Sequence, residues 1–280
     1  MTGTAPDDGI EPAELRKVAE QLAVEAADFV RRRRTEVFPA GGRAGSSVVR
    51  AKTTPTDPVT VVDTESERLL RGRLAQLRPG DAVLGEEEGG TAQVAAGRPV
   101  WVLDPIDGTV NFVYGLGAYA VSVGVQIDGV SVAGAVANAA TGEVYSAARG
   151  QGATLTDADS CITLHCNEIT ELPMALVGTG FAYDREHRRR QADVLTDLLA
   201  EVRDIRRVGS CALDLCMVAA GRLDAYFESG VHLWDWAAGA LIAAEAGAVL
   251  RLPYSDDLVI AAAPGIAGAL TAHLERAGYR

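Results

Sequence analysis

The 280-residue sequence predicts a mixed fold of the α+β or α/β class, because helical and strand patterns both occur along the chain. Apolar residues recur at three- and four-residue steps over residues 12–34, the periodicity of an amphipathic helix. The stretches 118–127, 130–137 and 143–147 alternate in hydrophobicity, which is typical of neighbouring antiparallel strands. Further strands are expected near 174–178 and 223–228, and further helices near 187–202, 210–220 and 235–247.

The segments around the first helix have recognisable ends. The arginine run Arg31–Arg34 favours a helix C-terminus through the helix dipole, and we interpret it as a solvated helix end rather than a nucleic-acid patch. A second helix is expected over residues 62–77, capped near Thr60 or Asp63. Residues 39–58 are rich in Gly, Ser, Thr and Pro, which indicates a mobile loop with a short strand.

The chain is expected to divide into three parts. Residues 1–12 form a disordered tail, residues 13–155 an N-terminal α+β subdomain, and residues 156–280 a C-terminal α/β subdomain. The division is placed in the weakly patterned stretch 153–172. The sequence shows no internal repeat and no low-complexity linker.

The overall charge limits the classes of partner. A net charge of −12 and a pI near 4.8 argue against direct nucleic-acid binding, which requires a basic face. The N-terminus lacks the pattern of a signal peptide, and no apolar run approaches the roughly 18 residues of a membrane span. We therefore expect a cytoplasmic protein that binds neither nucleic acid nor membrane directly.

Two aspartates follow a short apolar strand at residues 100–103. Asp104 lies at its carboxyl end, and after a bend at Pro105 the chain brings Asp107 back to nearly the same place. Together with the Ile106 carbonyl they form a cluster of hard oxygen ligands of the kind that Mg²⁺ prefers. Either aspartate alone could belong to a turn or cap a helix, but both together behind a buried strand favour a metal site.

Other acids occur at comparable places. Glu86 follows an apolar strand at residues 82–85, Asp235 begins an apolar helix, and Asp63 precedes another helix. Taken singly, these residues are explained by a solvated loop or a helix cap. Several carboxylates that converge in a site of low dielectric remain ionised only with cations between them.

Three motifs, in their order and separation, resemble the inositol monophosphatase family: Gly85-Glu86-Glu87, Asp104-Pro-Ile-Asp-Gly-Thr109 and Trp234-Asp235-x-Ala-Ala-Gly239. The resemblance extends over about residues 12–265 and is greatest to bacterial, particularly actinobacterial, inositol-1-monophosphatases. It implies a layered αβαβα sandwich of the inositol monophosphatase and sugar phosphatase type. It also implies a Mg²⁺ site of two to three ions, inhibition by lithium, a role in inositol metabolism and a homodimer.

The resemblance also assigns roles to individual residues. Glu86, Asp104 and the Ile106 carbonyl would bind the first Mg²⁺, Asp104, Asp107 and Asp235 the second, and Glu86 would share a third. Asp63 and Thr109 would orient and deprotonate the attacking water. The amides of Gly108 and Thr109 would bind phosphate, Lys52 would lie on the mobile loop near the metals, and Gly209, Ser210, Cys211 and Glu228 would face the hydroxyls of the sugar alcohol.

The implied reaction is hydrolysis of a small phosphorylated polyol, myo-inositol monophosphate, by water that a metal ion activates. Departures such as Tyr114, where many relatives have histidine, and Cys211, where alanine is usual, affect substrate preference and remove no metal ligand. Fructose-1,6-bisphosphate, histidinol phosphate and nucleotide 3′-phosphates remain alternative substrates, although Glu228 favours an inositol ring because a carboxylate would repel a second phosphate. A regulatory protein that binds the transcription or ribosome-assembly machinery is the alternative of a different class.

Overall fold

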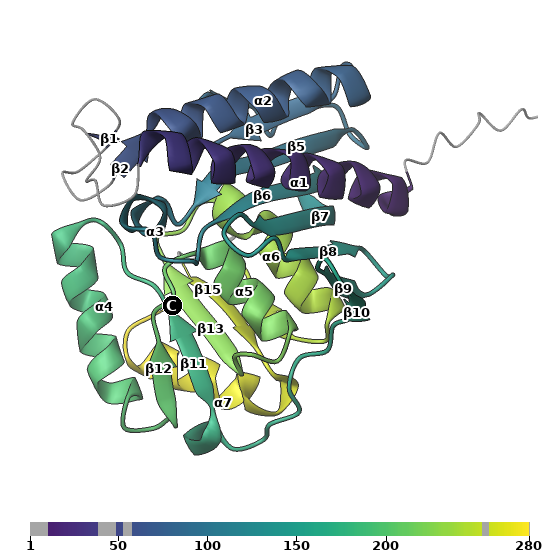
Figure 1. Cartoon of the computed structure of the whole chain (residues 1–280). Helices are drawn as coiled ribbons and strands as arrows, with labels where there is room; N and C mark the ends of the chain where they lie inside the picture. Colours follow the sequence, from purple (N-terminus) through teal and green to yellow (C-terminus); the bar gives the residue numbers. More distant parts are fainter. Residues whose placement is uncertain (1–10, 39–48, 53–57, 254–257, 280) are drawn as a thin grey trace, which may run out of the picture.

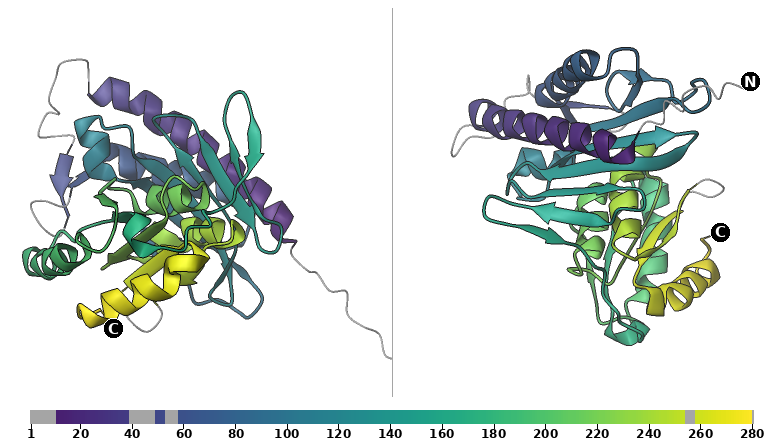
Figure 2. Two further views of the ribbon diagram at one scale, coloured as in Figure 1. Left: turned by 90° about the horizontal axis from the view of Figure 1, so that it is seen from below. Right: turned by 90° about the vertical axis from the view of Figure 1, so that its right-hand side faces the viewer.

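The computed structural model describes residues 11–38, 49–52, 58–253 and 258–279, so residues 1–10 of the expected tail and most of the expected mobile loop lie outside the described residues. Residue 12, the last of the expected tail, is already the first residue of a helix. Five layers of helices and sheets stack on one another (Figures 1 and 2). This order of layers confirms the predicted αβαβα sandwich. The helices of the outer and central layers are α1 (Pro12–Val37), α2 (Val61–Leu77), α4 (Arg185–Leu198), α5 (Cys211–Ala219), α6 (Leu233–Glu245) and α7 (Pro264–Arg276).

The first sheet has eight strands in the order β10-β9-β8-β7-β6-β5-β3-β4. Their bounds are β3 (Ala82–Gly85), β4 (Gly89–Gly90), β5 (Pro99–Asp107), β6 (Ala120–Ile127), β7 (Val130–Asn138), β8 (Val144–Ala148), β9 (Ala153–Thr156) and β10 (Cys161–Thr163). The expected antiparallel arrangement of β6, β7 and β8 is confirmed, and β3 pairs with β5 in parallel. The stretch 153–172 also contributes β9 and β10 to this sheet, and the expected division at 155/156 falls inside β9.

The second sheet has five strands in the order β12-β11-β13-β15-β14. Their bounds are β11 (Leu176–Thr179), β12 (Asp204–Arg206), β13 (Ala225–Ser229), β14 (Val249–Arg251) and β15 (Leu258–Ala262). Two outer strands, β12 and β14, have only three residues, too few for an alternating pattern to be recognised in the sequence. A separate two-stranded sheet consists of β1 (Val49–Ala51) and β2 (Pro58–Thr60).

Three apolar cores join these layers. Leu22 of α1 and Leu70 of α2 pack against one face of the first sheet, where Trp101 is fully buried. Helices α5 and α6 fill the space between the two sheets, and α4 and α7 cover the outer face of the second sheet. All nine residues of β5 are buried, so any charged side chain on this strand must find a partner inside the protein.

Helix α6 lies unusually close to the first sheet because glycines face it. A Cβ atom on Gly124 of β6 would lie 2.9 Å from the Cβ of Ala237, and one on Gly134 of β7 would lie 3.0 Å from the Cα of Ala238. These distances are below normal van der Waals contact. The small residues therefore fix the position of α6, and with it the position of Asp235 in its first turn.

No helix among the described segments is long and apolar enough to cross a membrane.

Gly134→Val should push α6 away from the sheet. Overpacking of this kind costs about 1–3 kcal/mol, so the midpoint of urea unfolding should fall. Gly72→Ala is the matched control, because a Cβ on Gly72 of α2 meets no atom within 4 Å and alanine favours the helix. An unchanged midpoint in Gly134→Val would contradict the close approach of α6.

Candidate active site

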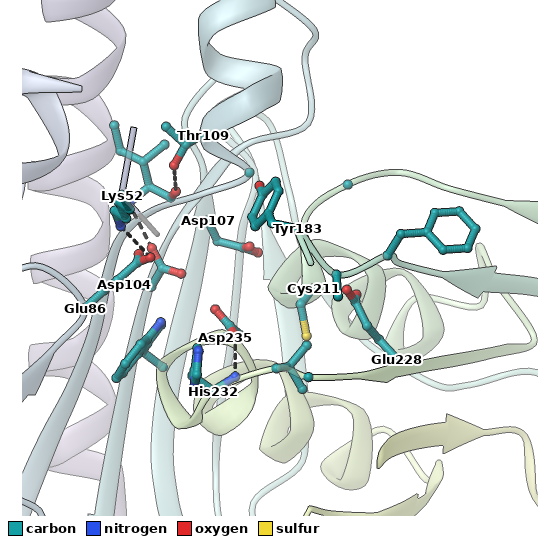
Figure 3. Close-up of a pocket in the computed structure, with 18 of the residues that line it drawn as sticks. Lys52, Glu86, Asp104, Asp107, Thr109, Tyr183, Cys211, Glu228, His232 and Asp235 are labelled. Atoms are coloured by element: carbon teal, nitrogen blue, oxygen red, sulfur yellow. Dashed lines mark hydrogen bonds and ion pairs between the residues drawn. The ribbon is translucent and has the colours of Figure 1, made fainter. Parts of the chain in front are cut away.

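A β-bulge in β5 brings two aspartates to the same side of the sheet. Asp104 pairs with Ser122 of β6, whereas Asp107 pairs with Ala120, so three steps on β5 correspond to two on β6. In a regular strand, residues three positions apart point to opposite faces. The extra residue of the bulge reverses this relation, and Asp104 and Asp107 therefore project into the same cavity (Figure 3).

The third carboxylate comes from α6. Asp235 occupies the third position of the helix and accepts a hydrogen bond from the His232 backbone N–H at 2.5 Å, which closes the first turn. One oxygen from each of Asp104, Asp107 and Asp235 lies within 4.8 Å of the others. Residues that are about 130 positions apart in the sequence thus meet at one point, as the sequence predicted.

The parallel pairing of β3 with β5 explains the position of Glu86. Gly85 is opposite Leu103, so the next residues, Glu86 and Asp104, lie side by side at the point where β3 ends. The Lys52 ammonium donates hydrogen bonds to Glu86 at 2.7 Å and to Glu87 at 2.5 Å. Lys52 thus lies beside the acidic cluster, and Glu87, which belongs to the Gly85-Glu86-Glu87 motif but was given no predicted role, shares this lysine.

The turn of three glutamates that follows β3 is held in place by a side chain of α2. Glu67 is fully buried and accepts hydrogen bonds from the backbone N–H groups of Glu87 at 2.7 Å and Glu88 at 3.1 Å. Asp63 and Ser66 lie on the same face of the helix, where Leu70 and Leu74 continue the buried stripe. Glu67 could have been identified from the sequence, because helical periodicity places this charged residue on the buried face of α2.

Burial and mutual repulsion disfavour the ionised forms of these acids. Burial is the first cause, and the neighbouring carboxylates the second, of the raised pKa values of Asp104 and Asp235. Burial likewise raises the pKa of Asp107 to about 7, although hydrogen bonds from Ser210 and Ala212 oppose the shift. At neutral pH the cluster needs compensating positive charge beyond Lys52.

The donor set fits a hard divalent cation. The cavity is lined by four residues with carboxylates, Glu86, Asp104, Asp107 and Asp235, and by Ile106, whose backbone carbonyl offers a further oxygen. Mg²⁺ prefers oxygen ligands, whereas zinc sites are built mainly from nitrogen and sulfur. The geometry therefore supports a metal site, and the chemistry of the donors favours Mg²⁺.

Asp63 and Thr109 form a hydrogen-bonded pair beside the cluster. The Thr109 hydroxyl lies 3.0 Å from Asp63 Oδ1 and 3.0 Å from the Ile106 carbonyl, and its single hydrogen can go to either. Asp63 also caps α2 by accepting hydrogen bonds from the Thr60 N–H at 2.9 Å and the Thr60 hydroxyl at 2.5 Å. Burial raises the pKa of Asp63 to about 6, close to the range useful for proton transfer.

Gly108 allows the turn between the bulge and the short helix α3 (Thr109–Tyr114). Its φ of 90° lies in the left-handed region, and a Cβ there would lie 2.9 Å from the Ala118 carbonyl oxygen. Gly108 and Thr109 both line the cavity.

The opposite wall of the cavity comes from the second half of the chain. Gly209, Cys211 and Glu228, the residues expected to face a polyol, line this wall. Ser210 is not among the described lining residues. Its hydroxyl donates to Asp107 at 2.5 Å and it caps α5, so it lies behind the acidic cluster.

The cavity has a volume of about 490 Å³. Several of the residues that line it were not predicted from the sequence. The additional lining residues include Phe181, Tyr183, Asp184, His187, Arg207, His232 and Trp234. His232 and Trp234 stack at 4.8 Å between ring centroids and lie next to Asp235. Residues 181–187 form a loop and helix start without periodicity, and only the tertiary structure brings them to the site.

The chain is similar over nearly its whole length to proteins of one family. Residues 11–278 match the inositol monophosphatase family. An inositol-1-monophosphatase of Mycobacterium leprae is 62% identical over 283 residues, which cover 98% of this chain and 97% of the relative. A Nus factor SuhB of Vibrio cholerae is 38% identical over 69% of this chain and 71% of its own length.

A solved structure of Mycobacterium tuberculosis SuhB is 58% identical and superposes with a TM-score of 0.83, covering 96% of this chain and 99% of that chain. The sequence, the layered fold and the acidic cluster thus point to the same enzymes. The chain belongs to the inositol monophosphatase family and is a phosphomonoester hydrolase of that metal-dependent type.

Proposed function

We propose that the protein hydrolyses myo-inositol monophosphate to inositol and phosphate with two to three Mg²⁺ ions. The observation that carries this proposal is the convergence of Asp104, Asp107 and Asp235 beside the Asp63–Thr109 pair in one cavity. The high identity to inositol-1-monophosphatases supports the choice of substrate.

The ions would be held by the acidic cluster. Glu86, Asp104 and the Ile106 carbonyl would bind one ion, Asp104, Asp107 and Asp235 a second, and Glu86 would share a third. Bound Mg²⁺ supplies the positive charge that lowers the pKa of water and stabilises the leaving oxygen.

The chain's own residues move the proton. Thr109 Oγ1 can accept a proton from the attacking water while its own hydrogen passes to Asp63 Oδ1, 3.0 Å away. The raised pKa of Asp63 makes it a stronger base than an ordinary aspartate. The hydroxide then displaces inositol from phosphorus, and the departing oxygen takes up a proton from solvent.

Phosphate and polyol occupy opposite ends of the cavity in this proposal. The amides of Gly108 and Thr109 would bind the phosphate, and Glu228 would accept hydrogen bonds from ring hydroxyls. Burial raises the pKa of Glu228, and the nearby Arg207 opposes this shift.

Arg207 favours a second candidate, hydrolysis of a sugar bisphosphate such as fructose-1,6-bisphosphate. Arg207 lines the cavity, and its positive charge acts electrostatically on Glu228. A cation at this place offsets the repulsion that Glu228 alone would exert on a second phosphate.

The proposed protein is also cytoplasmic, forms a homodimer and is inhibited by lithium. The resemblance to the family supports these three properties.

Phosphate release from inositol 1-phosphate, fructose-1,6-bisphosphate, histidinol phosphate and adenosine 3′,5′-bisphosphate tests the proposed substrate. Inositol 1-phosphate should give the highest kcat/KM. Asp104→Asn should lower kcat at least about a hundredfold, because it removes charge from two metal sites at once. A preference for another ester would reject the substrate, and a near-normal kcat in a folded Asp104→Asn variant would reject the metal mechanism.

Thr109→Val keeps the shape of the side chain and removes the hydroxyl. It should lower kcat by about 10²–10⁴-fold, the usual contribution of a positioned proton acceptor, while binding of Mg²⁺ persists. Steady-state kinetics and Mg²⁺ titration followed by thermal shift separate the two effects. Thr196→Val, on the exposed side of α4, is the control and should retain full activity. Unimpaired turnover in Thr109→Val would exclude the proposed proton path.

Stability without metal should depend on pH. Between pH ~4, the ordinary aspartate pKa, and about pH 7, the raised pKa of Asp107, the folded protein keeps protons on the buried acids that the unfolded chain has lost. The free energy of unfolding should therefore fall as pH rises through this range. Mg²⁺ competes with these protons, so it should raise Tm more at pH 8 than at pH 5. Thermal unfolding at both pH values with and without Mg²⁺ measures the difference. An equal or larger Mg²⁺ effect at pH 5 would be inconsistent with a buried acidic site.

A further inference from the structure

The carboxylate of Glu228 is held from behind by a buried tyrosine. Tyr226 and Glu228 lie two residues apart on β13, so their side chains project to the same face of the sheet. The Tyr226 hydroxyl donates a hydrogen bond to Glu228 Oε2. Tyr226 is completely buried, whereas Glu228 reaches the cavity.

Gly180 confines the same carboxylate from the side. A Cβ atom at this position would overlap all three carboxyl atoms of Glu228. The backbone of Gly180 is not in the left-handed region, so alanine would be accepted there apart from this collision. A side chain at position 180 would therefore displace the Glu228 carboxylate from the place that it occupies.

Cys211 completes the surroundings of the Tyr226 hydroxyl. Burial first, and the neighbouring Cys211 next, raise the pKa of the Tyr226 hydroxyl, so the phenol stays protonated and able to donate. Cys211 also lines the cavity.

We propose that Tyr226 is a positioning residue that makes the enzyme select hydroxylated phosphate esters, by holding the Glu228 carboxylate against Gly180 so that it faces the cavity. This inference rests on the proposed function, because Glu228 is the residue assumed to contact the polyol.

The selectivity follows from orientation. The Tyr226 hydrogen bond occupies Oε2, and the remaining acceptor capacity of the carboxylate is available to substrate hydroxyls. Without this anchor the side chain of Glu228 gains rotamers and must be ordered by each substrate that binds. An ester without polyol hydroxyls makes no use of Glu228, so it should be insensitive to the loss.

Tyr226→Phe tests the inference with two substrates, inositol 1-phosphate and p-nitrophenyl phosphate. The variant keeps the ring and removes one hydrogen bond to a charged group, so KM for inositol 1-phosphate should rise roughly tenfold. Both constants for p-nitrophenyl phosphate should stay within about twofold. Gly180→Ala displaces the carboxylate by an independent route and should change the same ratio in the same direction.

Tyr145→Phe is the matched control. Tyr145 is also buried, but its hydroxyl accepts a hydrogen bond from Arg222 rather than contacting the cavity wall. It should leave the ratio of kcat/KM for the two substrates unchanged.

Equal losses for both substrates in Tyr226→Phe, or no loss for either, would overturn the inference. Failure of the proposed function has a different signature, because it would show in the wild-type protein as hydrolysis of p-nitrophenyl phosphate without hydrolysis of inositol 1-phosphate. In that case glycerol 2-phosphate replaces inositol 1-phosphate as the hydroxylated substrate. The ratio of its kcat/KM to that of p-nitrophenyl phosphate, measured in the same variants, then decides the inference.

Discussion

Repulsion among carboxylates that the fold forces together is the constraint on which the site depends. Asp104, Asp107 and Asp235 lie within 4.8 Å of one another, and burial and their mutual charges raise their pKa values. An arrangement that is unfavourable without a ligand fits the metal dependence of the family, because a bound cation would offset the repulsion. The fold must therefore hold these carboxylates in place against their mutual repulsion.

Several parts of the fold contribute to this placement. The bulge in β5 places two aspartates on one side, the parallel pairing with β3 adds Glu86, and Glu67 holds the turn that follows. Close packing of α6 against glycines of the first sheet fixes Asp235. The second sheet contributes the wall with Glu228, so that the acidic cluster and the wall opposite it come from different layers.

Long, periodic elements and the acidic motifs could be predicted from the sequence, because both depend on local patterns. The helices α1 and α2, the antiparallel strands β6 to β8 and the fold class are confirmed. Three-residue strands such as β12 carry no periodic signal. Ser210 and Glu67 act through partners that are distant in sequence, and their contacts depend on tertiary packing that no local pattern encodes.

A crystal structure grown with Mn²⁺ in place of Mg²⁺ tests the central claim most directly, since anomalous scattering locates the ion without assumption. Manganese shares the preference of magnesium for carboxylate and carbonyl oxygens. The account predicts an anomalous peak in contact with oxygens of Asp104, Asp107 and Asp235. A fully active crystal batch with no peak among these three carboxylates would contradict it.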